Sequence, residues 1–162
     1  MKLEPQDQRH LTAAEGYLEM GMFLAADAAL DEIAPEFRHF PQVLNIREKI
    51  YEGMERWDMA VEIAKALMAA EPDSPRRATC LARVTRRAQS LEAAIAVLQA
   101  AIERRTSNNQ VYYDLACYTC LKGDMVEALA YLEQAIKLDP GLRLVSLEDE
   151  DLTQLWMELG KK

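Results

Sequence analysis

The chain has 162 residues, a formal net charge of −8 and three cysteines. The acidic balance argues against nucleic-acid binding, because phosphate contacts need a basic surface, and an odd, small cysteine count fits a reducing compartment better than a disulfide framework. No apolar run approaches the roughly 18 residues of a membrane span, and residues 1–20 carry charges without a continuous apolar run, so we expect neither a membrane span nor a signal peptide, and a cytoplasmic location.

The sequence predicts four successive pairs of helices. Apolar residues recur at helical spacing, and no stretch keeps the period-two alternation of strands. The six prolines stand at predicted boundaries, since proline is tolerated in the first turn of a helix or just past its end. The predicted helices span 7–20 and 23–34, 41–54 and 57–71, 75–88 and 91–105, and 109–122 and 125–138.

A last helix is predicted over 148–159. It begins with four acidic residues, which suit the positive end of the helix dipole. Its apolar residues share one face: Leu152, Leu155, Trp156 and Leu159. We interpret this segment as a cap that covers the preceding helices, because solenoids generally need a capping element. The alternative is a peptide that docks on another molecule.

A 34-residue period runs through the four helix pairs. Alanine recurs at the same place in each: Ala26, Ala60, Ala94 and Ala128. Further columns keep this register, with a mostly large apolar residue four positions later: Leu30, Ala64, Leu98 and Leu132. Small residues suit places where two helices approach closely, and large residues fill the gaps between units. A fixed repeat of this length predicts a stacked array rather than one globular core.

The clearest unit is 112–140, YYDLACYTCLKGDMVEALAYLEQAIKLDP. It resembles the tetratricopeptide repeat family at eight positions: Tyr112, Leu115, Ala116, Gly123, Ala128, Leu132, Ala135 and Pro140. Thr119 departs from the pattern, where tyrosine is usual. The resemblance implies an all-α fold, an α-α superhelix (solenoid) of about four helical hairpins plus a C-terminal capping helix. It implies a single array over 1–162, with units at about 7–40, 41–74, 75–108 and 109–142 and the cap at about 148–159.

In this family the first helix of each unit lines a concave groove. Carried onto this sequence, the resemblance gives these candidate groove residues: Asn45, Lys49, Arg76, Arg83, Arg86 and Tyr113. Arginine holds carboxylates through paired hydrogen bonds, so the predicted partner is a protein or peptide with an acidic or carboxylate-bearing segment. Arg83 and Arg86 are expected to face solvent. The alternative is that these arginines form an ordinary solvated helix face.

One short motif carries possible chemistry, the pair Cys117 and Cys120 in a C-x-x-C spacing. A structural zinc site needs four ligands, and a redox pair needs a helix N-terminus after a strand. Only Cys80 remains as a further cysteine, and the pair lies well inside a predicted helix. We therefore interpret both as small packing residues, and expect no metal, no cofactor and, without any catalytic motif, no enzyme.

Two functions remain. The first is a non-catalytic interaction module or adaptor that binds a partner peptide in its groove. The second is a structural or assembly subunit that self-associates or joins a larger complex through its end faces. A homodimer through the first repeat is suggested by a dense apolar set there, because large apolar patches mark interfaces: Tyr17, Leu18, Met20, Met22, Phe23 and Leu24.

Overall fold

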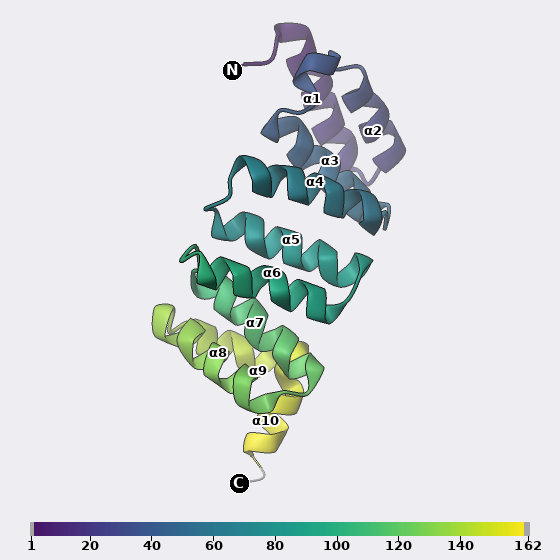
Figure 1. Cartoon of the computed structure of the whole chain (residues 1–162). Coiled ribbons are helices and arrows are strands. Elements are labelled where there is room, and N and C mark those ends of the chain that lie inside the picture. Colours follow the sequence, from purple (N-terminus) through teal and green to yellow (C-terminus); the bar gives the residue numbers. More distant parts are fainter. Residues whose placement is uncertain (1, 161–162) are drawn as a thin grey trace. The chain divides into compact units, whose positions relative to one another are not determined.

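The computed structural model describes residues 2–160, and these residues form helices and connecting turns without a strand. The chain divides into two compact units, Met1–Glu71 and Pro72–Lys162. Figure 1 shows the helices of each unit following one another as antiparallel pairs. The all-α fold predicted from the sequence is confirmed.

Unit 1 contains two helical hairpins. The helices α1 and α2 pack together, as do α3 and α4, and α3 also packs on α1 and α2. Their bounds are α1 Pro5–Glu19, α2 Phe23–Asp31, α3 Pro41–Gly53 and α4 Trp57–Ala70, with a 3-10 turn η1 at Pro35–Phe37.

Unit 2 contains two more hairpins and a C-terminal tail. The α5–α6 and α7–α8 pairs pack together, α7 contacts both α5 and α6, and the tail packs on α7 and α8. The bounds are α5 Pro75–Ala88, α6 Leu91–Glu103, α7 Asn109–Lys122, α8 Met125–Leu138, α9 Leu142–Glu148, η2 Glu150–Leu152 and α10 Thr153–Leu159.

Local sequence explains the helix ends. Proline opens α1, α3 and α5, where its missing N–H is not needed. The side chains of Ser90, Asn108 and Asp124 accept a backbone N–H in the first turns of α6, α7 and α8, respectively. Gly123 ends α7 in the left-handed region at φ 94°, a conformation that costs glycine no Cβ clash.

The alanine column lies in the core of both units. Ala26, Ala60, Ala94 and Ala128 are each 0% exposed. The column four residues later is buried as well, from Leu30 to Leu132. Each alanine stands in the second helix of its hairpin, where only a small side chain lets the first helix approach. The packing role predicted for this column is confirmed.

The tail differs from the single helix predicted over 148–159. A helix that the sequence did not predict, α9, ends at Glu148, and a bend at Asp149 precedes η2 and α10. The Asp149 carboxylate accepts the Asp151 N–H at 2.9 Å, which stabilises the bend. The Trp156 indole donates to the Ser146 carbonyl at 2.6 Å, which joins α10 to α9. Because Leu152 and Leu155 are fully buried against the preceding helices, the tail covers unit 2 as a cap.

Candidate functional site

The predicted groove residues of unit 2 lie on two neighbouring helices. Arg76, Arg83 and Arg86 come from α5, and Tyr113 comes from α7, which packs beside α5. We call this surface the α5/α7 face and include Cys117 in it. Arg76 and Arg83 are exposed, whereas Arg86 is half-buried and Tyr113 is buried. Arg86, which was expected to face solvent, keeps 34% of its side chain exposed.

The α5/α7 face is partly covered by the acidic tail of the same chain. The Tyr113 hydroxyl donates to the Asp149 carboxylate at 2.8 Å, and the Cys117 thiol lies 3.8 Å from the same oxygen. Arg86 Nη1 donates to Asp151 Oδ2 at 3.0 Å and forms an ion pair with it. Two helices thus hold two carboxylates that stand two residues apart in the sequence.

Arg86 is positioned by a ring as well as by the tail. Its guanidinium carbon lies 5.1 Å from the centre of the Tyr118 ring, within the range of a cation–π contact. Burial lowers the pKa of Arg86, but the hydrogen bond and charge of Asp151 act in the opposite direction, and the net pKa is raised. Arg86 therefore remains a fixed positive charge beside Asp151.

The C-x-x-C pair is buried and its thiols are free. Burial, followed by the charges of Asp149 and other carboxylates, raises the pKa of the Cys117 thiol far above its ordinary value. Burial also raises the pKa of Cys120. Both side chains are buried in unit 2, as expected of small packing residues. Within residues 2–160, no three His, Cys, Asp or Glu side chains gather in a metal-binding arrangement.

Asp114 is a titratable group that the sequence did not single out. Burial raises its pKa from 3.8 to about 6, and the nearby Asp149 charge adds to this, while the Gln110 hydrogen bond of 2.7 Å and the Arg83 charge oppose it. Burial in the tertiary structure, followed by the nearby charges of Arg83 and Asp149, distinguishes this carboxyl from others in the chain. Its ionisation therefore reports on the electrostatics of the α5/α7 face.

We expect Asp114→Asn to change how stability depends on pH. The folded state holds the Asp114 proton more tightly than the unfolded chain, so this group stabilises the fold below pH about 4, and its contribution is lost as the pH rises through about 6. Relative to wild type, the variant should gain free energy of unfolding across that interval. Urea denaturation over this pH range measures the difference. An equal pH profile for wild type and variant contradicts it, and Asp73→Asn, at an exposed position, serves as the control.

The two remaining predicted groove residues belong to unit 1. Asn45 is half-buried and Lys49 is exposed, and they stand one turn apart on α3. A neighbouring α3 side chain, Arg47, forms ion pairs with Asp27 at 3.4 Å and with Asp31 at 2.6 Å. The α3 arginine thus ties α3 to α2 within unit 1.

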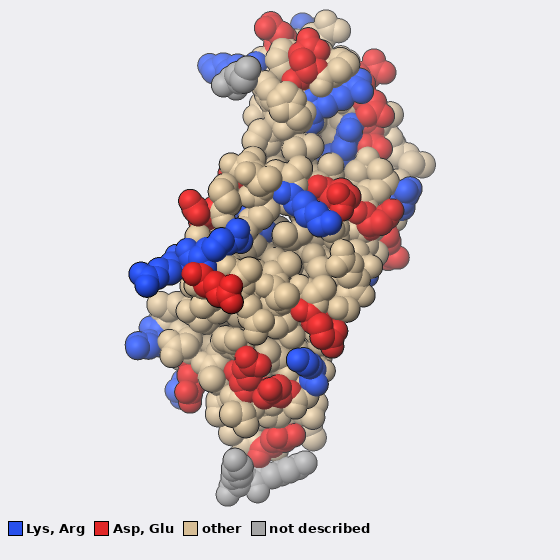
Figure 2. Space-filling view, viewed as in Figure 1, with Lys and Arg blue, Asp and Glu red and all other residues tan. Residues whose placement is uncertain are grey.

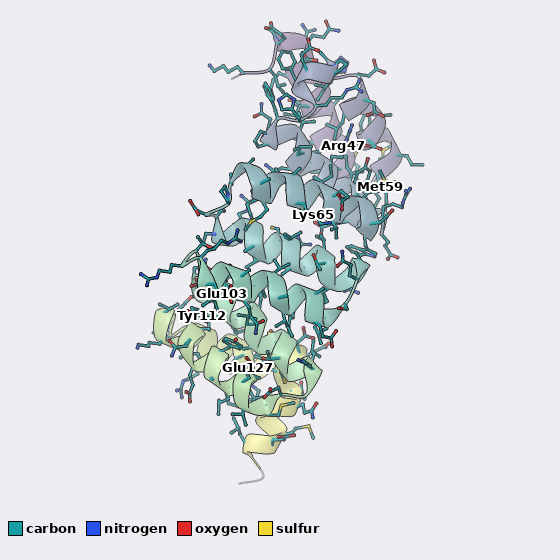
Figure 3. All side chains as sticks on the ribbon, viewed as in Figure 1. Arg47, Met59, Lys65, Glu103, Tyr112 and Glu127 are labelled. Atoms are coloured by element: carbon teal, nitrogen blue, oxygen red, sulfur yellow. The ribbon has the colours of Figure 1, made fainter. Side chains whose placement is uncertain are left out.

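A hollow of about 500 Å³ in unit 2 lies between α6 and α8, with Tyr112 of α7 in its lining. Figure 3 shows Glu103 and Tyr112 at one end of α6 and α7, with Glu127 at the beginning of α8. The Tyr112 and Tyr131 rings lie 6.5 Å apart, and Tyr131 donates to Glu127 at 3.1 Å.

The face drawn in Figure 2 carries charges of both signs dispersed among uncharged residues, without one broad basic patch.

None of the helices in residues 2–160 is long and apolar enough to cross a membrane. No protein-family model matches the chain, and no curated protein matches it.

Solved structures match the fold closely despite low identity. The structure described as MamA protein gives a TM-score of 0.73 at 19% identity, over 96% of this chain and 83% of that one. A MamA fragment from Desulfovibrio magneticus RS-1 gives 0.70 at 15% identity, over 83% and 76%, respectively. A putative kinesin light chain from Podospora anserina with TPR-like repeats gives 0.64 at 18% identity, over 96% and 87%. The chain therefore has a tetratricopeptide-repeat fold, an all-α solenoid.

Proposed function

We propose that the protein is a non-catalytic interaction module that binds an acidic or carboxylate-bearing peptide on the α5/α7 face. The observation that carries this proposal is the docking of Asp149 and Asp151 on Tyr113 and Arg86. A surface that already accommodates two carboxylates has the hydrogen-bond donors and positive charge that an acidic partner needs. Arg76 and Arg83 extend the basic surface along α5.

We also propose two binding positions in unit 1. They are Asn45 and Lys49 on α3, which offer an amide and a positive charge one turn apart. A cytoplasmic location is also proposed, supported by the three free thiols at Cys80, Cys117 and Cys120.

We expect Arg76→Glu with Arg83→Glu to abolish binding of acidic peptides. Reversal of two charges replaces attraction with repulsion, while both positions are exposed, so helix content should be unchanged. Fluorescence anisotropy with short acidic, neutral and basic peptides, each with a free or an amidated C-terminus, measures the preference. Wild type should bind the acidic peptides best, and more weakly as salt is added.

The matched control is Arg104→Glu with Arg105→Glu, which makes the same change in net charge at exposed positions beyond the end of α6. This control should bind like wild type. Equal loss in both double variants would mean that overall charge, rather than the α5/α7 face, governs binding. No preference of wild type for acidic peptides would contradict the proposed function itself.

A second candidate function, assembly through an end face, is favoured by the turn between α1 and α2. Met20, Met22 and Leu24 are 64%, 49% and 76% exposed, and Met22 and Leu24 line a shallow hollow together with Phe23 and Met54. Such a cluster is typical of an interface. Light scattering over a concentration series tests it: Leu24→Ser should convert a dimer to a monomer, whereas Val126→Ser, at an exposed position in unit 2, should not. A monomeric wild type would contradict this candidate.

A further inference from the structure

The tail touches the α5/α7 face through groups whose chemistry is that of a bound peptide. Asp149 takes a hydrogen bond from Tyr113 and is approached by the Cys117 thiol, and Asp151 takes one from Arg86. Tyr113 and Arg86 stand at positions that the family resemblance predicts for the binding surface, and Cys117 lies one turn after Tyr113 on α7. The tail therefore occupies the place that the proposed function gives to a partner.

Apolar contacts anchor the same segment. Leu152 is 0% exposed and Leu155 is 1% exposed, and η2 and α10 both pack on α7. The spacing is compact: two carboxylates two residues apart, a leucine directly after the second, and another leucine three residues later. This order of groups, Asp-x-Asp-Leu-x-x-Leu, is what the tail presents to the helices of unit 2.

The helices of the tail are too short to be stable by themselves away from this face. The helices α9 and α10 have seven residues each and η2 has three, and isolated helices shorter than about 12–15 residues are marginal in water. Docking and folding of the tail are therefore one event. Because the tail packs on α7 and α8 but belongs to neither hairpin, it can open locally while the α5–α6 and α7–α8 hairpins remain folded.

We propose that the segment 149–155 is an intramolecular competitor that closes the α5/α7 face, and that a partner with the same Asp-x-Asp-Leu arrangement binds by replacing it. This inference rests on the proposed function, since it takes the α5/α7 face as the binding site. A tethered competitor has an effective concentration that an external peptide must overcome. The closed tail raises the apparent Kd of a partner, which equals the intrinsic Kd divided by the fraction of molecules whose tail is open.

The test uses the full chain and a fluorescein-labelled peptide with the sequence of residues 146–157, SLEDEDLTQLWM. One variant, Asp149→Asn with Asp151→Asn, weakens the polar contacts of the tail. A second, Leu152→Ala with Leu155→Ala, weakens its apolar contacts. The matched control is Glu148→Gln with Glu150→Gln, which removes the same charge from two exposed neighbours. Hydrogen exchange of the tail amides reports in every variant whether the tail has opened.

Both tail variants should lose amide protection over 150–159 and bind the labelled peptide at least about tenfold more tightly than wild type, because the competitor is removed. The control should match wild type in both measurements. Arg86→Ala introduced into the Leu152→Ala, Leu155→Ala variant should then weaken peptide binding again.

Two results overturn the inference. One is a tail that stays protected in both variants, which would make it a fixed part of the core. The other is an open tail without tighter peptide binding, although short acidic peptides still bind wild type in the way the proposed function requires. If acidic peptides bind neither wild type nor any variant, the proposed function has failed and the inference fails with it.

Discussion

Replacing Ala128 with leucine is expected to lower the midpoint of thermal unfolding by several degrees. Ala128 is 0% exposed in α8, where α8 packs along α7. Extra methylenes in a close-packed site force shifts that cost about 1–3 kcal/mol, and each kcal/mol corresponds to about 2–4 °C in a chain of this length. Circular dichroism at the helix band during heating measures the change.

The same helix supplies the control for that prediction. Ala130 lies two residues later, is exposed and lines the hollow between α6 and α8. Ala130→Leu adds the same atoms at a position with free space, so its midpoint should stay near that of wild type. If Ala128→Leu also unfolds at the wild-type temperature, the alanine column does not govern the approach of the two helices.

The second large effect is expected at Leu155, the buried leucine of α10. Leu155→Ala removes a fully buried side chain, and such changes cost about 2–5 kcal/mol when the surrounding core stays closed. In this variant the stability lost cannot exceed the free energy that holds the tail on α7 and α8. If the cost of the cavity is greater than that free energy, the tail opens and the cavity no longer forms. We therefore expect the tail amides to lose most of their protection from hydrogen exchange, while the α7–α8 hairpin keeps most of its own.

Met157→Ala is the matched control for Leu155→Ala. Met157 stands two residues away in α10 and is 59% exposed, so its truncation should leave exchange unchanged. Unchanged protection in the Leu155 variant would show that the tail is held by polar contacts alone. A greater tendency to aggregate is expected of the Leu155 variant only, because an open tail uncovers apolar surface of α7 and α8.

The repeat and its hairpins could be predicted from the sequence because they depend on local information. Small and large residues recur every 34 positions, and prolines mark the beginnings of α1, α3 and α5. The core positions follow from this register, as the complete burial of Ala26, Ala60, Ala94 and Ala128 confirms.

The tail could be predicted only in part, because its conformation depends on distant contacts. Its apolar face was visible in the sequence, but the bend at Asp149 follows from a hydrogen bond with Tyr113, 36 residues away, and from the Asp151 N–H. The acidic run was interpreted as a helix start for the dipole. It instead supplies a partner to Arg86, 65 residues earlier. The opposite charges of the arginine-rich segment and the tail were the signal for this contact.

Amide and side-chain NMR shifts during titration with the residue 146–157 peptide test the central claim most directly. The Asp149→Asn, Asp151→Asn variant of the full chain is the sample, since its α5/α7 face should be open. We predict that the shifts concentrate at Arg83, Arg86 and Tyr113 and that they vanish in high salt. Shifts confined to the hollow between α6 and α8, or to residues 20–24 of unit 1, would contradict the assignment of the α5/α7 face as the binding site.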